Sequence, residues 1–230
     1  RSQKNNLASE MVMRESSLVE TQSNVTSRIH EDLSKDMNIY LDPYDIAPLS
    51  ALVTFTTDEE VAVTVTVRGQ KGSPDLTHTF ETSFEHILPI YGLYADSANE
   101  VIISYDKESI PLTIQTDALP DDFTVPTSTY IKDEYAHMLN DFYFVTPASV
   151  GYTSAFDAQG NVRWYLTEQL VWEIRTLNNG NLILSNEKLI NPPYYTTGMY
   201  ELGLLGNIKK EYIMPGGYSH DVAELPNGNL

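Results

Sequence analysis

The sequence predicts an all-β chain in two β-rich parts behind a short helical arm, and three observations lead to this fold class. Residues 37–119 contain short runs with the two-residue alternation of β-strands, separated by turn-forming residues. Residues 140–230 contain Asn-Gly turns that recur at a nearly constant spacing. The 230 residues are 41% hydrophobic and 20% charged, which is enough apolar material for folded cores. We therefore expect an arm over residues 1–36, a sandwich domain over 37–119, a connector over 120–139 and repeated sheets from 140 to 230.

Charge and cysteine content exclude several classes of function. Lys+Arg 14 against Asp+Glu 32 give a net charge of −18, so the chain lacks the basic surface that nucleic acids and anionic membranes attract. Cysteine is absent, which excludes disulfides, thiolate metal sites and a cysteine nucleophile in this sequence. The sequence shows neither a signal peptide nor an apolar run of membrane-spanning length. We expect no nucleic-acid partner and no membrane insertion, and the opening Arg1 suggests that a leader is absent from this chain.

The arm is expected to form one or two amphipathic helices. Its apolar residues recur at roughly helical spacing: Leu7, Met11, Leu18, Val25, Ile29 and Leu33. The polar face is not basic, which disfavours a membrane-surface helix. The arm is expected either to pack on the rest of the chain or to contact a second copy in a homodimer.

Residues 37–119 are expected to form a small antiparallel β-sandwich of fibronectin type III or immunoglobulin kind, because six or seven short strands fit into about eighty residues. The run Val61–Val67 alternates strictly, so its valines share one face. The other expected strands are Leu49–Phe55, Leu76–Phe80, Phe84–Ile90, Val101–Tyr105 and Leu112–Thr116, and turns are expected at 57–60, 71–74, 96–99 and 106–108. The run Gly92–Ile103 resembles the corner between two late strands of such a domain.

Three histidines precede the repeats, with His78 and His86 in expected strands and His137 in the connector. A metal site would need further ligands that converge on them, and the pattern shows none. We expect these histidines to be structural and the chain to bind no metal.

From residue 140 onward, two turn motifs repeat independently. Gly160-Asn161 aligns with Gly206-Asn207 at a spacing of 46, and Leu177–Leu182 aligns with Leu225–Leu230 at a spacing of 48. A period in the forties that consists of strands joined by Asn-Gly hairpins is typical of β-propeller blades.

The repeat predicts one complete blade with parts of its two neighbours. The complete blade has strands at Glu173–Leu177, Leu182–Asn186, Met199–Leu204 and Ile208–Met214, and strands two to four of an earlier blade are expected at Asp141–Thr146, Ser154–Asp157 and Val162–Leu166. The inner strand of that earlier blade is expected from a segment beyond residue 230. A further blade opens at His220 and has only begun its second strand at Leu230, so we expect the chain to be the N-terminal piece of a longer protein.

Candidate site residues follow from the 48-residue register. His220-Asp221-Val222 aligns with Trp172-Glu173-Ile174 at the start of inner strands, and propellers commonly bind ligands where inner strands converge on the central channel. This nominates His220 and, secondarily, Trp172. The His-Asp pair alone is weak evidence, because adjacent side chains in a strand point to opposite faces and Asp221 could bind a backbone amide or solvent. Trp172 and Tyr218 could contact an aromatic ligand or pack in the blade.

Residues 140–230 resemble the start of the catalytic propeller of bacterial arylsulfate sulfotransferases, on the segments Gly151–Tyr165, Leu177–Leu182 and His220-Asp221 with Leu225–Leu230. Residues 37–119 are similar to the N-terminal β-sandwich of that family. The resemblance implies a six-bladed propeller in an exported enzyme, periplasmic or secreted, that moves a sulfuryl group from an aryl sulfate donor to a histidine and then to a phenolic acceptor, without PAPS.

The resemblance also implies roles for residues. His220 matches one of several active-site histidines and would support the reaction at a sulfuryl or phenol oxygen, whereas the nucleophilic histidine, another histidine and an arginine would lie beyond residue 230. The 230-residue chain alone is then expected to be inactive. A non-catalytic secreted protein that uses the propeller and the sandwich for binding stays open as an alternative, because propellers serve many functions.

Overall fold

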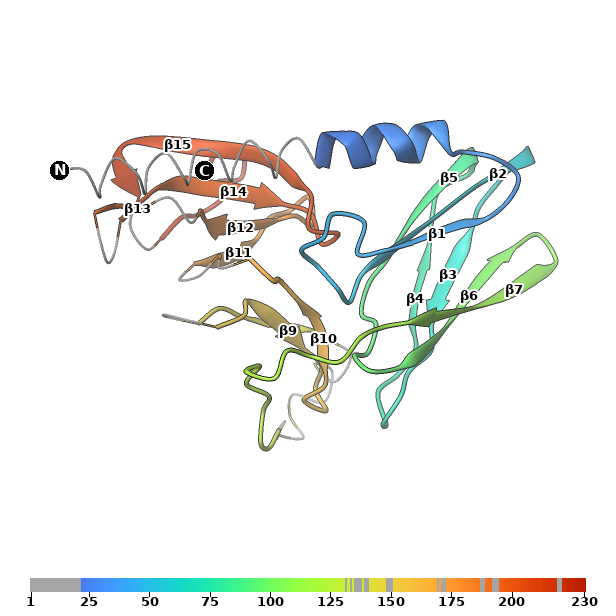
Figure 1. The fold of residues 1–230 in the computed structure, drawn as a ribbon, viewed down its shortest axis with the longest axis horizontal. Helices are drawn as coiled ribbons and strands as arrows, with labels where there is room; N and C mark the ends of the chain where they lie inside the picture. Colours follow the sequence, from blue (N-terminus) through green and yellow to red (C-terminus); the bar gives the residue numbers. More distant parts are fainter. Residues whose placement is uncertain are drawn as a thin grey trace.

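A computed structural model shows the fold (Figure 1). It describes residues 22–130, 132, 134, 138, 141–147, 151–168, 170, 173–186, 189–191, 195–218 and 221–230. Within these residues the chain forms one α-helix, over 22–31, and fifteen strands in four antiparallel sheets, which we name sheets A to D. None of the helical residues described forms a helix long and apolar enough to cross a membrane. The predicted all-β class is confirmed.

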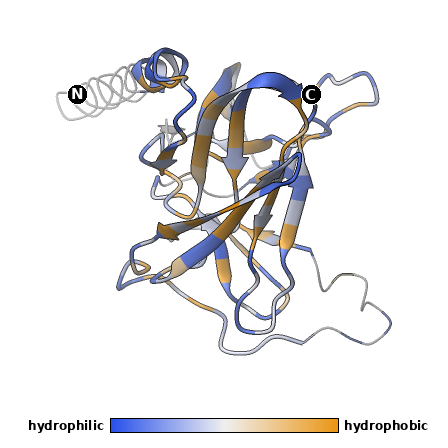
Figure 2. Cartoon of the chain, turned by 90° about the vertical axis from the view of Figure 1, so that its right-hand side faces the viewer, coloured by the Kyte–Doolittle hydropathy of each residue, from blue (hydrophilic) through white to orange (hydrophobic). Residues whose placement is uncertain are grey.

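Sheets A and B form the predicted Ig-like sandwich, on the right in Figure 1. Sheet A has the order β1-β2-β5, and sheet B has the order β4-β3-β6-β7. The strands are β1 (Asn38–Leu41), β2 (Ala51–Val61), β3 (Thr64–Val67), β4 (Leu76–Thr79), β5 (Ser83–Ile90), β6 (Ala98–Tyr105) and β7 (Glu108–Gln115). Apolar and polar residues alternate along these strands (Figure 2), so one face of each sheet supplies the core.

One expected strand and one expected turn were wrong. The Val61–Val67 run is not a single strand, because Val61 ends β2 in sheet A while Val65 and Val67 lie on β3 in sheet B. The turn expected at 57–60 is an irregular extension of β2, whose pairing with β5 shifts between Thr56 and Val61. All four valines are nevertheless buried, since the chain crosses between the two sheets with the same side facing the core.

The two sandwich histidines have the structural surroundings that were expected. His86 is buried, stacks on Phe55 with ring centroids 4.6 Å apart, and lies with Nε2 3.0 Å from Thr57 Oγ1. The Thr57 hydroxyl donates to the Glu59 carbonyl, so its oxygen accepts from His86 Nε2–H. His78 is exposed and lies edge-on to Phe80. His137 lies outside the described residues.

Sheets C and D follow the predicted repeat. Sheet C has the order β8-β9-β10, and sheet D has β11-β12-β14-β15, with β13 also paired to β14. The strands are β8 (Tyr143–Val145), β9 (Ser154–Phe156), β10 (Val162–Tyr165), β11 (Ile174–Thr176), β12 (Leu182–Ser185), β13 (Leu189–Asn191), β14 (Tyr195–Leu202) and β15 (Ile208–Tyr218). Apart from β13, strands that follow one another in the chain are neighbours in each sheet. This is the up-and-down strand order that a propeller blade requires.

Four turns have the same construction, three of them between these strands and the fourth after β15. In each, the carbonyl of the first residue accepts from the N–H of the glycine three positions later, and the N–H of the first residue donates to the carbonyl four positions later. The turns lie at 157–161, 177–181, 203–207 and 225–229. The turn glycines are Gly160, Gly180, Gly206 and Gly228, with φ of 81°, 81°, 91° and 81°. A three-residue hairpin loop needs this left-handed position, which explains the repeated Gly-Asn.

Comparison of the turns shows which strands correspond. The turn at 157–161 joins β9 to β10 as the turn at 203–207 joins β14 to β15, so β8 corresponds to β12. Among the described residues, sheet C contains no counterpart of β11. That a later segment supplies this strand stays a prediction, because part of the 131–140 stretch lies outside the described residues.

A buried carboxylate holds the turn of sheet D. Glu201 on β14 accepts hydrogen bonds from Asn179 Nδ2 at 3.0 Å, Asn181 Nδ2 at 2.6 Å and Tyr212 Oη at 2.9 Å, and its Oε2 lies 3.4 Å from Lys210 Nζ. Burial alone would raise its pKa, but these hydrogen bonds and the Lys210 charge outweigh burial and lower the pKa to about 2. The two asparagines therefore bind the β11–β12 turn to the next strand of the sheet.

The helix over 22–31 packs on the rest of the chain, which was one of the two arrangements expected for the arm. Val25 and Ile29 lie one turn apart on its buried face, and the Gln22 side chain donates to Gly206 O and accepts from Ile208 N–H at 2.9 Å. The helix thus contacts the outer hairpin of sheet D. The remaining arm residues before Gln22 lie outside the described residues.

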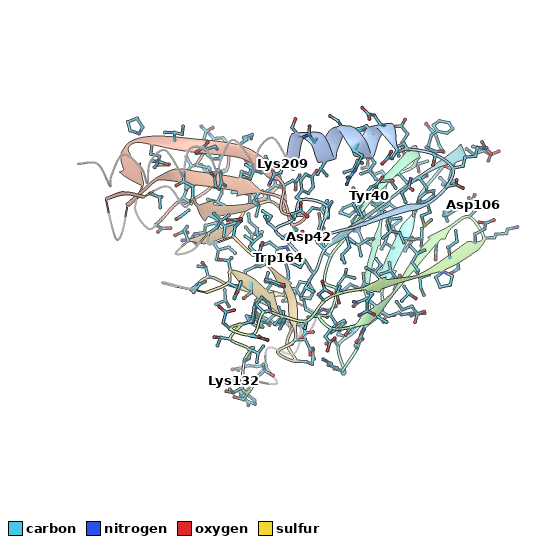
Figure 3. The ribbon with its side chains drawn as sticks, viewed as in Figure 1. Tyr40, Asp42, Asp106, Lys132, Trp164 and Lys209 are labelled. Atoms are coloured by element: carbon cyan, nitrogen blue, oxygen red, sulfur yellow. The ribbon has the colours of Figure 1, made fainter. Side chains whose placement is uncertain are left out.

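The sandwich and the repeated sheets meet at a buried junction. The loop between β1 and β2 places Ile46 and Ala47 against Trp164 and Leu202, and Ile46 O accepts from Thr167 N–H at 3.0 Å. Figure 3 shows Asp42 on the sandwich side of this junction and Trp164 on the other side. The sandwich therefore touches sheets C and D at the end where their β9–β10 and β14–β15 turns lie.

Arg163 is the centre of this junction. It is 1% exposed, and its guanidinium donates to Gly92 O from Nε at 2.9 Å and from Nη2 at 2.6 Å, and to Asp157 Oδ2 from Nη1 at 3.0 Å. It also lies 3.9 Å from the centroid of the Tyr94 ring. Ser73 completes the contact by donating to Asp157 Oδ2 at 2.7 Å. The hydrogen bonds of this buried ion pair to Gly92 O and from Ser73 therefore tie sheet C to the sandwich.

Candidate active site

The residues nominated from the sequence lie at the edge of what the structure describes. Trp172 and His220 are outside the described residues, and Tyr218 is described only as the last residue of β15, where its backbone pairs with Thr196. Their expected contacts with an aromatic ligand or a sulfuryl group stay predictions. The residues that follow Trp172 and His220 are described, and they show what surrounds the candidate site.

The segment 221–224 lies against β11, the first strand of sheet D. Asp221 Oδ1 accepts from Arg175 Nη2 at 2.7 Å, and Glu224 Oε2 accepts from the backbone N–H of Asn178 at 2.8 Å. Both contacts join residues 46 positions apart, so the segment runs in the same direction as β11. Between them, Val222 packs on the buried cluster that includes Leu177.

Arg175 binds two carboxylates. Its Nε donates to Glu173 Oε1 at 3.1 Å, while Nη2 donates to Asp221. The hydrogen bond from Arg175, together with its charge, holds the pKa of Asp221 below its ordinary value, and the same contact raises the pKa of Arg175. Glu173 and Asp221 are equivalent in the 48-residue register, so the same guanidinium binds the corresponding acid of two successive repeats. The register aligns these two residues, and the structure places both against one guanidinium.

The described cavities lie elsewhere, and one of about 570 Å³ borders Leu76 and Phe142. Two of about 520 and 510 Å³ share Thr26, Tyr44 and Lys209, between the helix, the sandwich and the outer hairpin of sheet D. The second also borders Asn179–Asn181, at the turn end of β11, whereas Glu173 and Asp221 lie at the end where β11 starts. In the part of the chain that the structure describes, no group of three or more His, Cys, Asp or Glu side chains could hold a metal ion.

Comparison with known protein families covers most of the chain. Residues 38–117 match the arylsulfotransferase Ig-like domain, and residues 127–230 match the arylsulfotransferase (ASST) domain. The chain belongs to the arylsulfotransferase family. The resemblance seen in the sequence is thereby confirmed, and the second match continues through the candidate site to Leu230.

Two curated relatives of this arylsulfotransferase chain are named arylsulfate sulfotransferase AssT. The protein from Lelliottia amnigena is 24% identical over 252 residues, and the protein from Escherichia coli O6:H1 (strain CFT073) is 20% identical over 256 residues. Each alignment covers 84% of this chain and 42% of the relative. The arylsulfotransferase chain therefore spans less than half the length of either relative.

Sequence reasoning missed Arg175, which contacts the two acids that directly follow Trp172 and His220 in the sequence. The 48-residue register aligns Glu173 with Asp221, but the pattern alone leaves Asp221 free to bind a backbone amide or solvent. The recurrence of an acid at one position of the repeat was the available signal, because an arginine beside two neighbouring carboxylates stabilises both of them. Arg175 is the cation that supplies this contact in the structure.

Proposed function

We propose that the protein containing this chain is an arylsulfate sulfotransferase whose catalytic β-propeller begins with sheets C and D and whose active site includes His220. The observation that carries the proposal is the ASST match over residues 127–230, which runs through His220. The names of the two relatives support the same activity. The up-and-down sheets and their repeated turns support a propeller.

The proposed reaction transfers a sulfuryl group in two steps without change of oxidation state. The S–O ester bond of an aryl sulfate breaks as an S–N bond forms to a ring nitrogen of a histidine located beyond residue 230, and the departing phenolate takes up a proton. An acceptor phenol then loses its proton, its oxygen forms a new S–O bond, and the S–N bond breaks to regenerate the histidine. Neither PAPS nor a metal ion takes part.

His220 has a supporting role in this proposal. Negative charge spreads over the sulfuryl oxygens and the leaving oxygen in the transition state, and an imidazole N–H donor stabilises such charge best when it is already in place. The same ring can pass a proton to the leaving phenolate. Trp172 and Tyr218 would contact the aryl ring of the donor or acceptor. We place the protein outside the cytoplasm, as the resemblance implies.

The test replaces His220 in the longer protein. His220→Ala is expected to lower transfer from 4-nitrophenyl sulfate to phenol by roughly 100-fold or more, measured as release of 4-nitrophenol. The matched control is His78→Ala, because His78 is an exposed histidine on the sandwich strand β4 and should not affect turnover. Wild-type turnover in His220→Ala would contradict the role of His220.

The 230-residue chain alone provides a second measurement. It is expected to release no 4-nitrophenol above the uncatalysed rate, because the proposed nucleophile is not among its residues. Transfer by this chain would contradict the placement of the nucleophile. Failure of the longer protein to transfer sulfuryl groups from any aryl sulfate would favour the alternative of a non-catalytic binding protein.

A further inference from the structure

A cavity of about 510 Å³ lies where the helix, the sandwich and sheet D meet. Its base belongs to a buried cluster that includes Ile29, Tyr44, Leu52 and Leu205. Its rim is polar and exposed, and it is formed by Thr26, His30, Asn179 and Lys209. Figure 3 shows Lys209 at the end of sheet D that lies next to the helix. A concave space of this size with an apolar base, at the meeting point of two domains, is typical of a pocket for a small molecule.

The charges at the rim favour a negative ligand. None of the described residues that line this cavity is acidic, although the chain has 32 Asp and Glu residues against 14 Lys and Arg. Lys209 and His30 do line it, and neither forms an ion pair with a residue that the structure describes. An ammonium group without a partner attracts an anion and repels a cation. The cavity therefore suits a ligand that carries its negative group at the rim.

The repeated turns give a second indication of an anion. The last residue of each turn is an asparagine, and the side-chain amides of Asn161 and Asn181 each donate to a buried carboxylate. The acceptor is Asp157 at 3.0 Å in the first turn and Glu201 at 2.6 Å in the second. In these two turns the asparagine therefore binds an anionic oxygen of the protein itself.

Asn207 is the corresponding residue of the third turn, and it lines the cavity. That turn begins with Gly203 where the first turn has Asp157, and the Asn207 amide forms no hydrogen bond with a residue that the structure describes. Lys209, two residues further on, lines the same cavity. An anion bound here would supply the oxygen that a carboxylate supplies in the other two turns.

The base of the cavity favours an aromatic body for this ligand. Tyr44 and Tyr91 offer ring surface, and Leu52 and Ile87 offer aliphatic surface, all within reach of one occupant of the cavity. Burial, with a smaller contribution from Tyr44, raises the pKa of Tyr91 to about 12, so this phenol stays neutral and adds no negative charge that would oppose an anion.

We propose that this cavity binds a small aromatic anion, with its ring on Tyr44 and Tyr91 and its negative group near Lys209 and Asn207. Such a ligand would contact the helix, the sandwich and sheet D at once, so its binding would stabilise their arrangement. The inference goes beyond the proposed function, because the cavity lies at the turn end of β11 and takes no part in sulfuryl transfer.

The test titrates the 230-residue chain, which contains all the described residues of the cavity, with 4-nitrobenzenesulfonate. This probe has one ring and a sulfonate whose C–S bond sulfuryl transfer does not break. Isothermal titration calorimetry should show binding with a dissociation constant below about 1 mM, and the probe should raise the unfolding temperature of the chain. Uncharged nitrobenzene and the cation of 4-nitrobenzylamine should each bind about tenfold more weakly or worse, because they lack the anionic group.

Four variants locate the binding site. Lys209→Ala should weaken binding of the sulfonate about tenfold and Asn207→Ala roughly fivefold, while the affinity for nitrobenzene stays the same, because only contacts to the anionic group are lost. The matched controls are Lys107→Ala, at an exposed lysine in the turn between β6 and β7, and Asn229→Ala, at the last residue of the fourth turn. Neither control residue lines the cavity, so both variants should bind the sulfonate as wild type does.

Three results would overturn the proposal: no binding of the sulfonate, equal binding of 4-nitrobenzylamine, or wild-type affinity in both Lys209→Ala and Asn207→Ala. A dimer in sedimentation that Lys209→Glu dissociates would also overturn it, because the cavity would then belong to a contact between two copies of the chain. None of these results bears on sulfuryl transfer, so the proposed function stands or fails separately.

A second measurement applies if the chain alone does not unfold cooperatively. The longer protein is then photolabelled with 4-azidobenzenesulfonate, and the labelled peptides are identified by mass spectrometry. Label on peptides that contain Tyr44 or Tyr91, lost in Lys209→Ala and kept in Lys107→Ala, supports the proposal. Label that is absent from these peptides, or that is unchanged in Lys209→Ala, refutes it.

Discussion

Replacing Arg163 by methionine tests whether the buried junction holds the sandwich on the repeated sheets. The substitution removes two hydrogen bonds to Gly92 O and the ion pair with Asp157, and it leaves the Asp157 carboxylate, which is 4% exposed, without its cation. Methionine keeps most of the side-chain volume, so the effect reports on lost charge and hydrogen bonds more than on a cavity.

The magnitude follows from the burial of the pair. Removal of one partner of a buried ion pair costs about 3–5 kcal/mol. Asp157 would keep the donors Ser73 Oγ, Asn161 Nδ2 and two backbone N–H groups, so the low end, about 3 kcal/mol, applies. At an m-value of about 2–3 kcal/mol per molar urea, the unfolding midpoint would fall by roughly 1–1.5 M.

The assay is urea unfolding followed by tryptophan fluorescence, because Trp164 is buried at the same junction. Arg68→Ala is the matched control, since its pair with Asp75 is exposed, and its midpoint should stay close to wild type. The double variant Arg163→Met with Asp157→Asn should regain part of the loss, because no buried charge is left unpaired. An Arg163→Met midpoint equal to that of Arg68→Ala would refute the reasoning.

Two further predictions concern the same junction. Gly206→Ala should destabilise the protein more than Gly180→Ala: both glycines have positive φ, which costs about 1–2 kcal/mol for alanine, but only at Gly206 would the new Cβ meet a side chain, Ile46 Cγ1, at 2.6 Å. Equal urea midpoints would contradict the close approach of the sandwich loop. Burial of the Asp42 carboxyl raises its pKa to about 6, so folding favours its neutral form, and its contribution to stability is present below the ordinary pKa of about 3.9 and is lost as pH rises through 6. Asp42→Asn, which can still accept from Ala47 N–H, should therefore be more stable than wild type at pH 7, by less than about 3 kcal/mol because solvent screens the half-buried group, and the difference should vanish at pH 4. A constant difference between pH 4 and 7 would contradict this origin.

The features that the sequence predicts best are those that depend on neighbouring residues. Gly160-Asn161 and Gly206-Asn207 identify turns because the left-handed conformation of the glycine is a local requirement, and the structure has the same hydrogen bonds at both. The run Val61–Val67 shows the limit of periodicity. Alternation predicts that its valines face the core, but it cannot show that the chain changes sheets between Val61 and Thr64.

Features that depend on distant residues could not be predicted. Arg163 lies in the expected strand Val162–Leu166, where a charged residue would normally point to solvent, and its burial follows from Gly92 and Tyr94, which approach from the sandwich. At the candidate site, the register aligned Glu173 with Asp221, but no local pattern shows that Arg175 reaches both carboxylates. Which side chains meet across tens of residues can be known only once the fold is known.

The direction of the strands places the sandwich junction and the acids Glu173 and Asp221 at opposite ends of β11. In sheet D, β11 and β14 run in the same direction because each is antiparallel to β12, so the turns at 177–181 and 203–207 lie at one end of the sheet. The sandwich loop contacts Gly206 at that end, whereas Glu173 and Asp221 lie where β11 and the segment 221–224 start. With about 3.4 Å per residue, even the short β11 separates these ends by roughly 10 Å. Sandwich side chains at the junction therefore lie away from the start of β11, and changes at Arg163 should alter stability without a direct contact to Glu173 or Asp221.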